Sequence, residues 1–202
     1  NKTAMAAICK CVKDNKADLG LIFDTDVDRA GAVFADGEEI NRNRLIALIS
    51  AILLEEHPGS TIVTDSVTSD GLNEFITLRG GVHHRFKRGY KNVINEAIRL
   101  NKEGTYCPLA IETSGHAALK ENYFLDDGAY LVTRLIIKAA QLKKEGKDLK
   151  YLIKDLKMPL EEGEIRLGFF EKDFKSYGMK MIEELTDYSK KQAGFTIAPS
   201  NY

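Results

Sequence analysis

Three aspartates at alternate positions, followed at once by an arginine, are the residues whose types and spacing best suit chemistry. Asp24, Asp26 and Asp28 follow residues 21–23, an apolar run that predicts a buried strand ending where the acids begin. Side chains two residues apart point the same way in an extended chain, so the three carboxylates are expected to converge. Carboxylates this close repel one another unless a hard cation lies between them. Mg2+ suits such a site because it accepts a few carboxylates and keeps positions free for a phosphate oxygen.

Other interpretations of the same residues fit less well. Open α/β sheets bind ligands at the carboxyl ends of their strands, which favours a site over a solvated acidic turn. An EF-hand calcium loop starting at Asp24 needs Gly at its sixth position and Glu at its twelfth, where Arg29 and Ala35 stand. A haloacid-dehalogenase-type phosphatase has Thr or Val two residues after its second Asp, where this chain has Asp28. A carboxylate pair for sugar hydrolysis needs neither a third acid nor an adjacent arginine.

A second polar set follows the predicted strand 108–111. Glu112, Ser114 and His116 offer hydrogen-bond partners for hydroxyl groups. Gly115 allows a tight turn that brings the backbone close to a ligand. Such a set suits a polyol, and a polar turn with a capping serine is the alternative.

A third polar loop lies between a predicted strand and a predicted helix. It consists of Gly89, Tyr90 and Lys91 and follows Arg88. Its cations and the helix N-terminus suit an anion. A solvated surface loop is the alternative interpretation.

The elements that must position these loops alternate between strand and helix. A helix is predicted over residues 1–16, and Asp36-Gly37 marks the turn of a hairpin between residues 31 and 40. The following elements are helix 44–57, strand 61–64, a helix capped by Ser69 or Asp70 that runs to Leu78, strand 82–86, helix 91–101, strand 108–111 and helix 128–144 capped by Asp127. This spacing predicts an α/β fold, a three-layer α/β/α domain with a mainly parallel sheet, over residues 41–154.

The pattern changes after this unit. Residues 159–163 predict a linker, followed by a strand at 164–170 and an amphipathic helix at 174–188. This tail has too little apolar surface for a core of its own. The chain also opens inside a helical pattern, so both ends are expected to be partial segments of neighbouring domains.

Composition restricts the broad class of protein. Hydrophobic residues make up 44% and charged residues 29%, which is ordinary for a soluble globular protein. The net charge of −1 and the absence of a long apolar run give no reason to expect nucleic acid or a membrane as a partner. Cys9, Cys11 and Cys107 are odd in number and are expected to be reduced thiols of a cytoplasmic protein.

Four motifs occur along the chain in this order: Asp24-Thr-Asp-Val-Asp-Arg29, Gly89-Tyr-Lys91, Glu112-Thr-Ser-Gly-His116 and Asp126-Asp-Gly128. The first resembles the metal-binding loop Asp-Gly-Asp-x-Asp-Arg of the α-D-phosphohexomutases, the phosphoglucomutase/phosphomannomutase family. The third looks like that family's sugar-specificity loop, Gly-Glu-x-Ser-Gly-His, and the fourth is similar to its Asp-Asp-Gly segment. The second resembles the glycine–aromatic–lysine variant of the substrate loop in the third domain. Because order and spacing agree, the resemblance covers essentially the whole chain.

The sequence departs from the family pattern at several positions. Thr25 and Ile111 replace glycines, and Arg88 stands where a small or β-branched residue is usual. The family's phosphoserine loop, Thr-Ala-Ser-His-Asn-Pro, and the phosphate-binding loop of its fourth domain have no match in the sequence.

The resemblance implies a domain organisation. Residues 1–40 would be the C-terminal part of domain 2, residues 41–154 would be domain 3, and residues 155–202 would be a linker and a truncated start of domain 4. The intact enzyme would interconvert hexose 1-phosphate and hexose 6-phosphate, of glucose and/or mannose, through a phosphoserine and a hexose 1,6-bisphosphate intermediate. The remaining domains would act in cis, and the chain alone would be inactive.

The resemblance also implies a role for each site residue. Mg2+ would be held by Asp24, Asp26 and Asp28, and Arg29 would be a catalytic contact to phosphate or carboxylate near the metal. The residues expected to bind the phosphosugar are Glu112, Ser114, His116, Gly89, Tyr90 and Lys91. The alternatives are a phosphoglucosamine mutase, a non-catalytic sugar-phosphate-binding module and a haloacid-type phosphatase.

Overall fold

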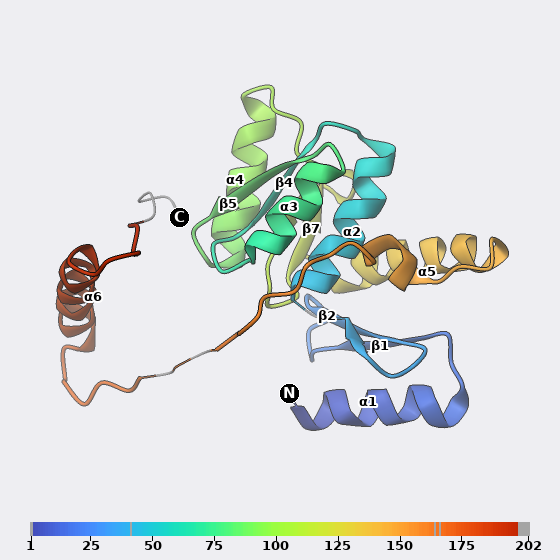
Figure 1. The fold of residues 1–202 in the computed structure, drawn as a ribbon, viewed down its shortest axis with the longest axis horizontal. Coiled ribbons are helices and arrows are strands. Elements are labelled where there is room, and N and C mark those ends of the chain that lie inside the picture. The colour runs from blue at the N-terminus through green and yellow to red at the C-terminus, as the bar shows by residue number, and fades with distance from the viewer. Residues whose placement is uncertain (1, 41, 164, 166, 198–202) are drawn as a thin grey trace. The chain divides into compact units, whose positions relative to one another are not determined.

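The computed structural model describes residues 2–40, 42–163, 165 and 167–197, and it divides into two compact units, residues 1–159 and 160–202 (Figure 1). The elements of the first unit are α1 (Lys2–Asn15), β1 (Leu19–Phe23), β2 (Ala30–Phe34), β3 (Glu39–Ile40), α2 (Asn43–Glu56), β4 (Thr61–Asp65), α3 (Asp70–Leu78), β5 (Val82–Phe86), α4 (Tyr90–Lys102), β6 (Leu109–Ile111), β7 (Ala117–Leu119), η1 (Lys120–Asn122), α5 (Gly128–Lys144) and η2 (Leu149–Ile153). The second unit contains α6 (Phe174–Lys190).

Two sheets organise the first unit. The larger has the strand order β5-β4-β6-β7, in which β5, β4 and β6 are parallel and β7 is antiparallel to β6. The smaller is antiparallel with the order β1-β2-β3. The predicted α/β fold with a mainly parallel sheet is therefore confirmed. The three-residue strand β7 was not predicted from the sequence.

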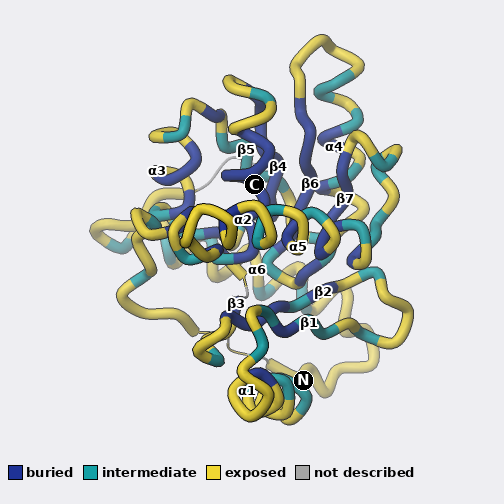
Figure 2. The backbone as a smooth tube through the Cα atoms, turned by 90° about the vertical axis from the view of Figure 1, so that its right-hand side faces the viewer, coloured by how far each residue is buried: buried dark blue, intermediate teal, exposed yellow. Residues whose placement is uncertain are grey.

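The parallel sheet is covered on both faces because neighbouring residues of a strand point to opposite sides. Ile62 of β4 belongs to the large apolar core formed with α2, α3 and α5. Val63, the next residue, belongs to a second core with Val93 and Ala97 of α4. The strands at the centre of Figure 2 are buried along their length, as expected for the middle layer of three.

Local signals at the ends of elements are also confirmed. The Ser69 hydroxyl accepts a hydrogen bond from the Leu72 N–H at 3.1 Å, so Ser69 and not Asp70 caps α3. Asp127 caps α5, because its Oδ1 accepts from the Tyr130 N–H at 2.9 Å.

Two strand predictions need correction. The strand predicted before the aspartates exists as β1, but it is not a buried strand: it lies in the small antiparallel sheet, Gly20 is its only buried residue, and Phe23 at its end is 39% exposed. The predicted strand 164–170 has no strand conformation at residues 165 and 167–170, while residues 164 and 166 lie outside the described part of the chain. A strand needs a neighbour to satisfy its backbone groups, and the described residues of this unit contain no second strand. None of the residues of α6 is buried.

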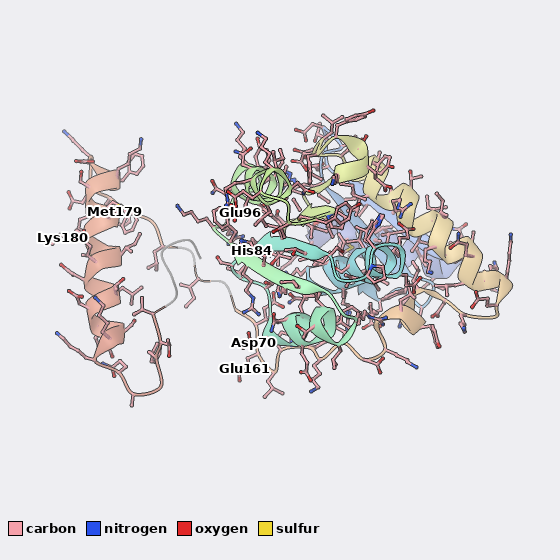
Figure 3. The ribbon with its side chains drawn as sticks, turned by 90° about the horizontal axis from the view of Figure 1, so that it is seen from above. Asp70, His84, Glu96, Glu161, Met179 and Lys180 are labelled. Carbon is pink, nitrogen blue, oxygen red and sulfur yellow. The ribbon has the colours of Figure 1, made fainter. Side chains whose placement is uncertain are left out.

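A polar network attaches α4 to the edge strand β5. His84 Nε2 lies 2.9 Å from Glu96 Oε1, and both residues are labelled in Figure 3. Arg99 donates to both carboxylate oxygens of Glu96, and these hydrogen bonds lower the pKa of that buried carboxyl group. The network fixes the orientation of α4, whose first turn carries the 89–91 loop.

Two further observations concern the thiols and the membrane. Cys9, Cys11 and Cys107 are free thiols, and burial raises the pKa of Cys107 to about 12. No helix in the described ranges is long and apolar enough to cross a membrane.

His83 of β5 gives the fold a specific pH dependence. Its Nε2 lies 2.8 Å from the Thr64 hydroxyl, whereas its Nδ1 is buried without a hydrogen-bond partner among the described residues. Burial lowers the pKa of His83 to about 3, and the charges of Arg85 and His84 add to this effect. The histidine is therefore neutral in the folded state at neutral pH.

We predict that His83→Gln makes the protein less sensitive to acid. Between about pH 6.5 and pH 3 the unfolded chain binds a proton at this position and the folded chain does not, so acidification lowers the free energy of unfolding. One such proton corresponds to about 1.4 kcal/mol per pH unit. Urea unfolding at pH 7, 6, 5 and 4 should give a shallower pH slope for His83→Gln than for the parent. Equal slopes for the parent and His83→Gln would contradict the assignment.

Candidate functional site

The loop of residues 24–29, called the metal loop below, connects β1 to β2. It is a tight turn, in which the Val27 N–H donates to the Asp24 carbonyl at 3.3 Å and Val27 has a φ of +65°. Carboxylate oxygens of Asp24, Asp26 and Asp28 lie within 4.8 Å of one another. The three side chains therefore meet as expected, but a turn brings them together and not an extended chain.

The charges of the metal loop are unevenly compensated. Asp24 accepts from the Arg29 Nε–H at 2.6 Å and from the Arg29 N–H at 3.2 Å. Partial burial raises the pKa of Asp24, but these Arg29 hydrogen bonds outweigh burial and lower it. Partial burial raises the pKa of Asp28, despite the opposing charge of His116. One guanidinium therefore offsets only part of the charge of three carboxylates.

The donor set of the metal loop fits a hard divalent cation. All three side chains present carboxylate oxygens, which Mg2+ prefers as ligands. Asp28 Oδ1 is buried and has no hydrogen-bond partner among the described residues. Arg29 Nε lies 3.8 Å from this oxygen, too far for a hydrogen bond, and a cation shared with Asp24 and Asp26 would satisfy it.

The loop of residues 112–116 connects β6 to the antiparallel β7. The Glu112 N–H donates to the His116 carbonyl at 2.9 Å, which closes the loop. Gly115 has a φ of +102°, and a Cβ placed there would lie 2.9 Å from the Ala30 carbonyl oxygen. Arg29 and His116 form an isolated antiparallel bridge. The 112–116 loop thus packs directly against the metal loop and the start of β2.

The 89–91 loop contacts the 112–116 loop through Glu112. The Gly89 N–H donates to Glu112 Oε1 at 2.5 Å, and the Ser114 hydroxyl donates to Glu112 Oε2 at 2.9 Å. Gly89 is the N-cap residue of α4, so a carboxylate lies at the positive end of this helix. Lys91 is exposed, and its Nζ lies 5.8 Å from the centre of the Tyr90 ring.

His116 is held between the two polar loops and the start of α5. Its Nδ1 lies 2.7 Å from Asp126 Oδ2 and 3.6 Å from Asp28 Oδ2. Its ring stacks on Tyr90, with centroids 4.7 Å apart and an angle of 18° between the planes. Burial raises the pKa of Asp126, although His116 opposes this effect.

The Asp126-Asp127-Gly128 segment supports the site at three points. Asp126 orients His116, Asp127 caps α5, and the Gly128 N–H donates to the Val27 carbonyl at 3.1 Å. Asp127 was predicted as a helix cap, but Asp126 was not named as a site residue from the sequence. Its position before the capping aspartate was the available signal.

A cavity of about 430 Å³ opens beside the two loops, a size that suits a small-molecule ligand. The polar and loop residues in its lining are Asp24, Arg29, Arg42, Thr113, Ser114 and Gly115. Arg42 and Thr113 were not named as site residues from the sequence, because neither lies in a charged pattern. The cavity is therefore lined by one carboxylate, Asp24, by two arginines and by the hydroxyl residues Thr113 and Ser114, whereas Asp26, Asp28, Glu112 and His116 are not in its lining.

Fold and site together define an α/β/α domain with acidic groups and hydrogen-bonding groups on adjacent loops. The family described as phosphoglucomutase/phosphomannomutase, alpha/beta/alpha domain III, matches residues 41–158. Because this match covers more than half of the sequence, the chain belongs to the phosphoglucomutase/phosphomannomutase family.

Individual relatives agree with this assignment. A phosphomannomutase/phosphoglucomutase of Pseudomonas syringae pv. tomato is 36% identical over 139 residues, 68% of this chain and 29% of the relative. A phosphoglucosamine mutase of Prochlorococcus marinus is 29% identical over 98% of this chain and 44% of its own length. A family member from Burkholderia thailandensis, solved by X-ray crystallography, has a TM-score of 0.78 and 27% identity, over 98% of this chain and 40% of that one. The chain thus spans less than half the length of these relatives.

We predict that Gly115→Ala separates the 112–116 loop from β2. Alanine at a positive φ costs about 1–2 kcal/mol by itself. At Gly115 the added Cβ also meets the Ala30 carbonyl at 2.9 Å, so the loss in the free energy of unfolding should be larger. Gly59→Ala is the matched control, since Gly59 has a φ of +81° and no atom lies within 4 Å of the position that its Cβ would take. Urea unfolding of both variants measures the difference, and equal losses would mean that the close approach does not constrain the loop.

Proposed function

We propose that this chain supplies the metal-binding and sugar-recognition parts of a phosphohexomutase. Such an enzyme interconverts the 1-phosphate and the 6-phosphate of a hexose, glucose and/or mannose. The observation that carries the proposal is the juxtaposition of two loops: His116 Nδ1 lies 3.6 Å from Asp28 Oδ2, and Gly115 packs on Ala30. A ligand in the adjacent cavity would contact Asp24 and Arg29 of the metal loop and Ser114 of the 112–116 loop, and the other proposed residues lie next to these.

In this proposal Asp24, Asp26 and Asp28 hold Mg2+. When bound, the cation supplies positive charge that stabilises the phosphoryl group during transfer. Arg29 uses its Nε–H for Asp24, and a guanidinium has further N–H donors that suit a phosphate oxygen. Arg29 therefore both holds one ligand of the metal and contacts the phosphate.

The other two loops recognise the sugar phosphate. Glu112 and Ser114 bind sugar hydroxyls, and His116 lies close to the sugar or its phosphate. Gly89, Tyr90 and Lys91 complete the substrate contacts, and the stacking of Tyr90 on His116 supports this grouping. The scheme requires a phosphoserine and a hexose 1,6-bisphosphate intermediate that turns over between two transfers. The serine must come from other domains in cis, so we expect no mutase activity from these 202 residues alone.

A phosphoglucosamine mutase is the second candidate. The observation that favours it is that the similarity to the Prochlorococcus marinus protein extends over 98% of this chain. Both candidates use the same metal loop and differ in the group at the sugar's second carbon. The choice between them therefore depends on the 112–116 loop.

We predict that Asp26→Asn weakens magnesium binding without affecting folding. Asp26 is exposed, so the substitution removes a charge and leaves the core unchanged. In an enzyme that contains this sequence with its phosphoserine domain, the Mg2+ concentration for half-maximal turnover should rise by about 10- to 100-fold or more, since even loss of an outer-shell group costs that much. Asp155→Asn, a substitution of an exposed aspartate elsewhere, should have no effect. An unchanged magnesium dependence in Asp26→Asn would refute the assignment.

We predict that Glu112→Gln impairs sugar recognition and not phosphorylation of the enzyme. Glutamine loses the charged acceptor that Glu112 offers, so kcat/KM should fall by about 1–3 kcal/mol with a raised KM. Phosphorylation of the serine by a bisphosphate donor should persist. Steady-state assays with glucose, mannose and glucosamine 1-phosphates measure the effect and identify the preferred sugar. Glu103→Gln, in an exposed ion pair with Arg99, is the control. Loss of phosphorylation with normal sugar binding would reverse the roles given to the two loops.

A further inference from the structure

Asp65 is an acidic residue in the interior that none of the proposed contacts explains. It is the last residue of β4, the strand between β5 and β6, and it is fully buried. It belongs neither to the metal loop nor to the 89–91 and 112–116 loops. An ionisable group at such a position costs free energy unless its hydrogen bonds are satisfied.

Both oxygens of the Asp65 carboxyl group are committed to one distant residue. Oδ1 accepts from the Thr113 N–H at 3.2 Å, and Oδ2 accepts from the Thr113 hydroxyl at 2.7 Å. The main chain of Asp65 is also fixed, since its carbonyl accepts from the hydroxyls of Thr64 and Thr68 at 3.1 and 3.2 Å. The carboxyl group therefore presents a rigid two-point acceptor to the 112–116 loop.

Thr113 lies between the two residues that we propose to bind sugar hydroxyls. Glu112 and Ser114 are its immediate neighbours, and they hydrogen-bond to each other at 2.9 Å. Because Thr113 is tied inward through both its backbone and its side chain, the positions of its neighbours are set by Asp65. Gly115 rests on Ala30 at the other side of the loop. The loop is thus held between the end of β4 and the start of β2.

The chemistry of this contact distinguishes it from ordinary packing. Burial raises the pKa of Asp65, and the two hydrogen bonds from Thr113 act against that rise. The remaining residues of β4 are threonines and aliphatic residues, so the strand itself does not require a carboxyl group here. A bidentate acceptor is useful where a partner must be fixed in both position and orientation.

We propose that Asp65 is a positioning residue for sugar recognition, which acts through Thr113 to hold Ser114, a residue of the cavity lining, and its hydrogen-bond partner Glu112. The sugar ligand rests on the proposed function, whereas the positioning of the loop is independent of it. Asp65 itself contacts no ligand in this proposal. Its removal should loosen one loop and alter the discrimination between sugars.

The test uses substitutions that remove or keep parts of the hydrogen-bonded contact between Asp65 and Thr113. Thr113→Val removes the hydroxyl and keeps the shape, while Thr113→Ser keeps the hydroxyl and should behave like the parent. Asp65→Asn retains an acceptor for the Thr113 N–H and should have an intermediate effect. Thr133→Val is the control, since the Thr133 hydroxyl bonds only within α5, to the Ala129 carbonyl at 2.8 Å. Thr113 lines the cavity and Asp65 does not, so Asp65→Asn is the variant that separates positioning from a direct effect on the cavity wall.

Two measurements separate the positioning of the 112–116 loop from the proposed enzyme activity. Hydrogen–deuterium exchange of the 202-residue chain should show faster exchange at residues 112–116 in Thr113→Val, with the rest of β4 and β6 unchanged. In the enzyme that contains this sequence, Thr113→Val should raise KM by about three- to tenfold and change the kcat/KM ratio of glucose 1-phosphate to mannose 1-phosphate. Its magnesium dependence should remain parental.

The outcomes of these measurements decide whether Asp65 positions the loop for sugar recognition. Faster exchange confined to the loop together with an altered sugar ratio supports the proposal. Unchanged exchange in the loop overturns the proposal. Faster exchange throughout the domain also overturns it, if Thr113→Ser shows the same increase. A loosened loop with unchanged KM and sugar ratio also overturns it, because Asp65 would then have a merely structural role. If the parental enzyme turns over no hexose phosphate, the proposed function fails, and the exchange data still decide whether Asp65 positions the loop.

Discussion

The close approach of backbones between neighbouring loops is the constraint on which the site depends. A Cβ at Gly115 would lie 2.9 Å from the Ala30 carbonyl oxygen, and a Cβ at Gly128 would lie 2.8 Å from the Arg29 carbonyl carbon. Side chains at these two positions would push the metal loop away from the 112–116 loop and from α5. Because both positions are glycine, His116 can lie within 3.6 Å of Asp28. The separation between the carboxylates of the metal loop and the polar side chains of the 112–116 loop is therefore set by main-chain contacts.

The charges of the acidic residues near the cavity are compensated by hydrogen bonds and nearby cations. Each acidic residue near the cavity except Asp26 has a hydrogen bond or a close cation in the described structure, but the compensation differs. Asp24 is paired with Arg29, Asp126 with His116, and Glu112 with the N-terminus of α4. Asp28 retains one buried oxygen without a hydrogen bond. The negative charge that is left uncompensated lies in the metal loop, where a divalent cation would neutralise it.

Support for these loops reaches into the sheet. Asp65 at the end of β4 holds Thr113, and the Glu96–His84–Arg99 network holds α4 on β5. The apolar cores on the two faces of the sheet keep β4 and β6 in register, so both supports have fixed positions. The parallel sheet contributes rigidity at its carboxyl edge, and the antiparallel hairpin β1–β2 contributes the metal loop.

Periodicity, capping residues and motif spacing determined much of this protein in advance. The alternation of apolar runs predicted the parallel sheet and its helices, and Ser69 and Asp127 were predicted as caps, because these features depend on residues close in sequence. The convergence of Asp24, Asp26 and Asp28 was predicted for the same reason, although a turn and not an extended strand produces it. Tertiary structure alone decided that β1 pairs in a separate sheet and that residues 165 and 167–170 form no strand. It also decided that Asp126, Arg42 and Asp65 lie at or beneath the site. Those facts depend on pairing partners and hydrogen bonds between distant residues, such as the 48-residue separation of Asp65 and Thr113, which local patterns do not encode.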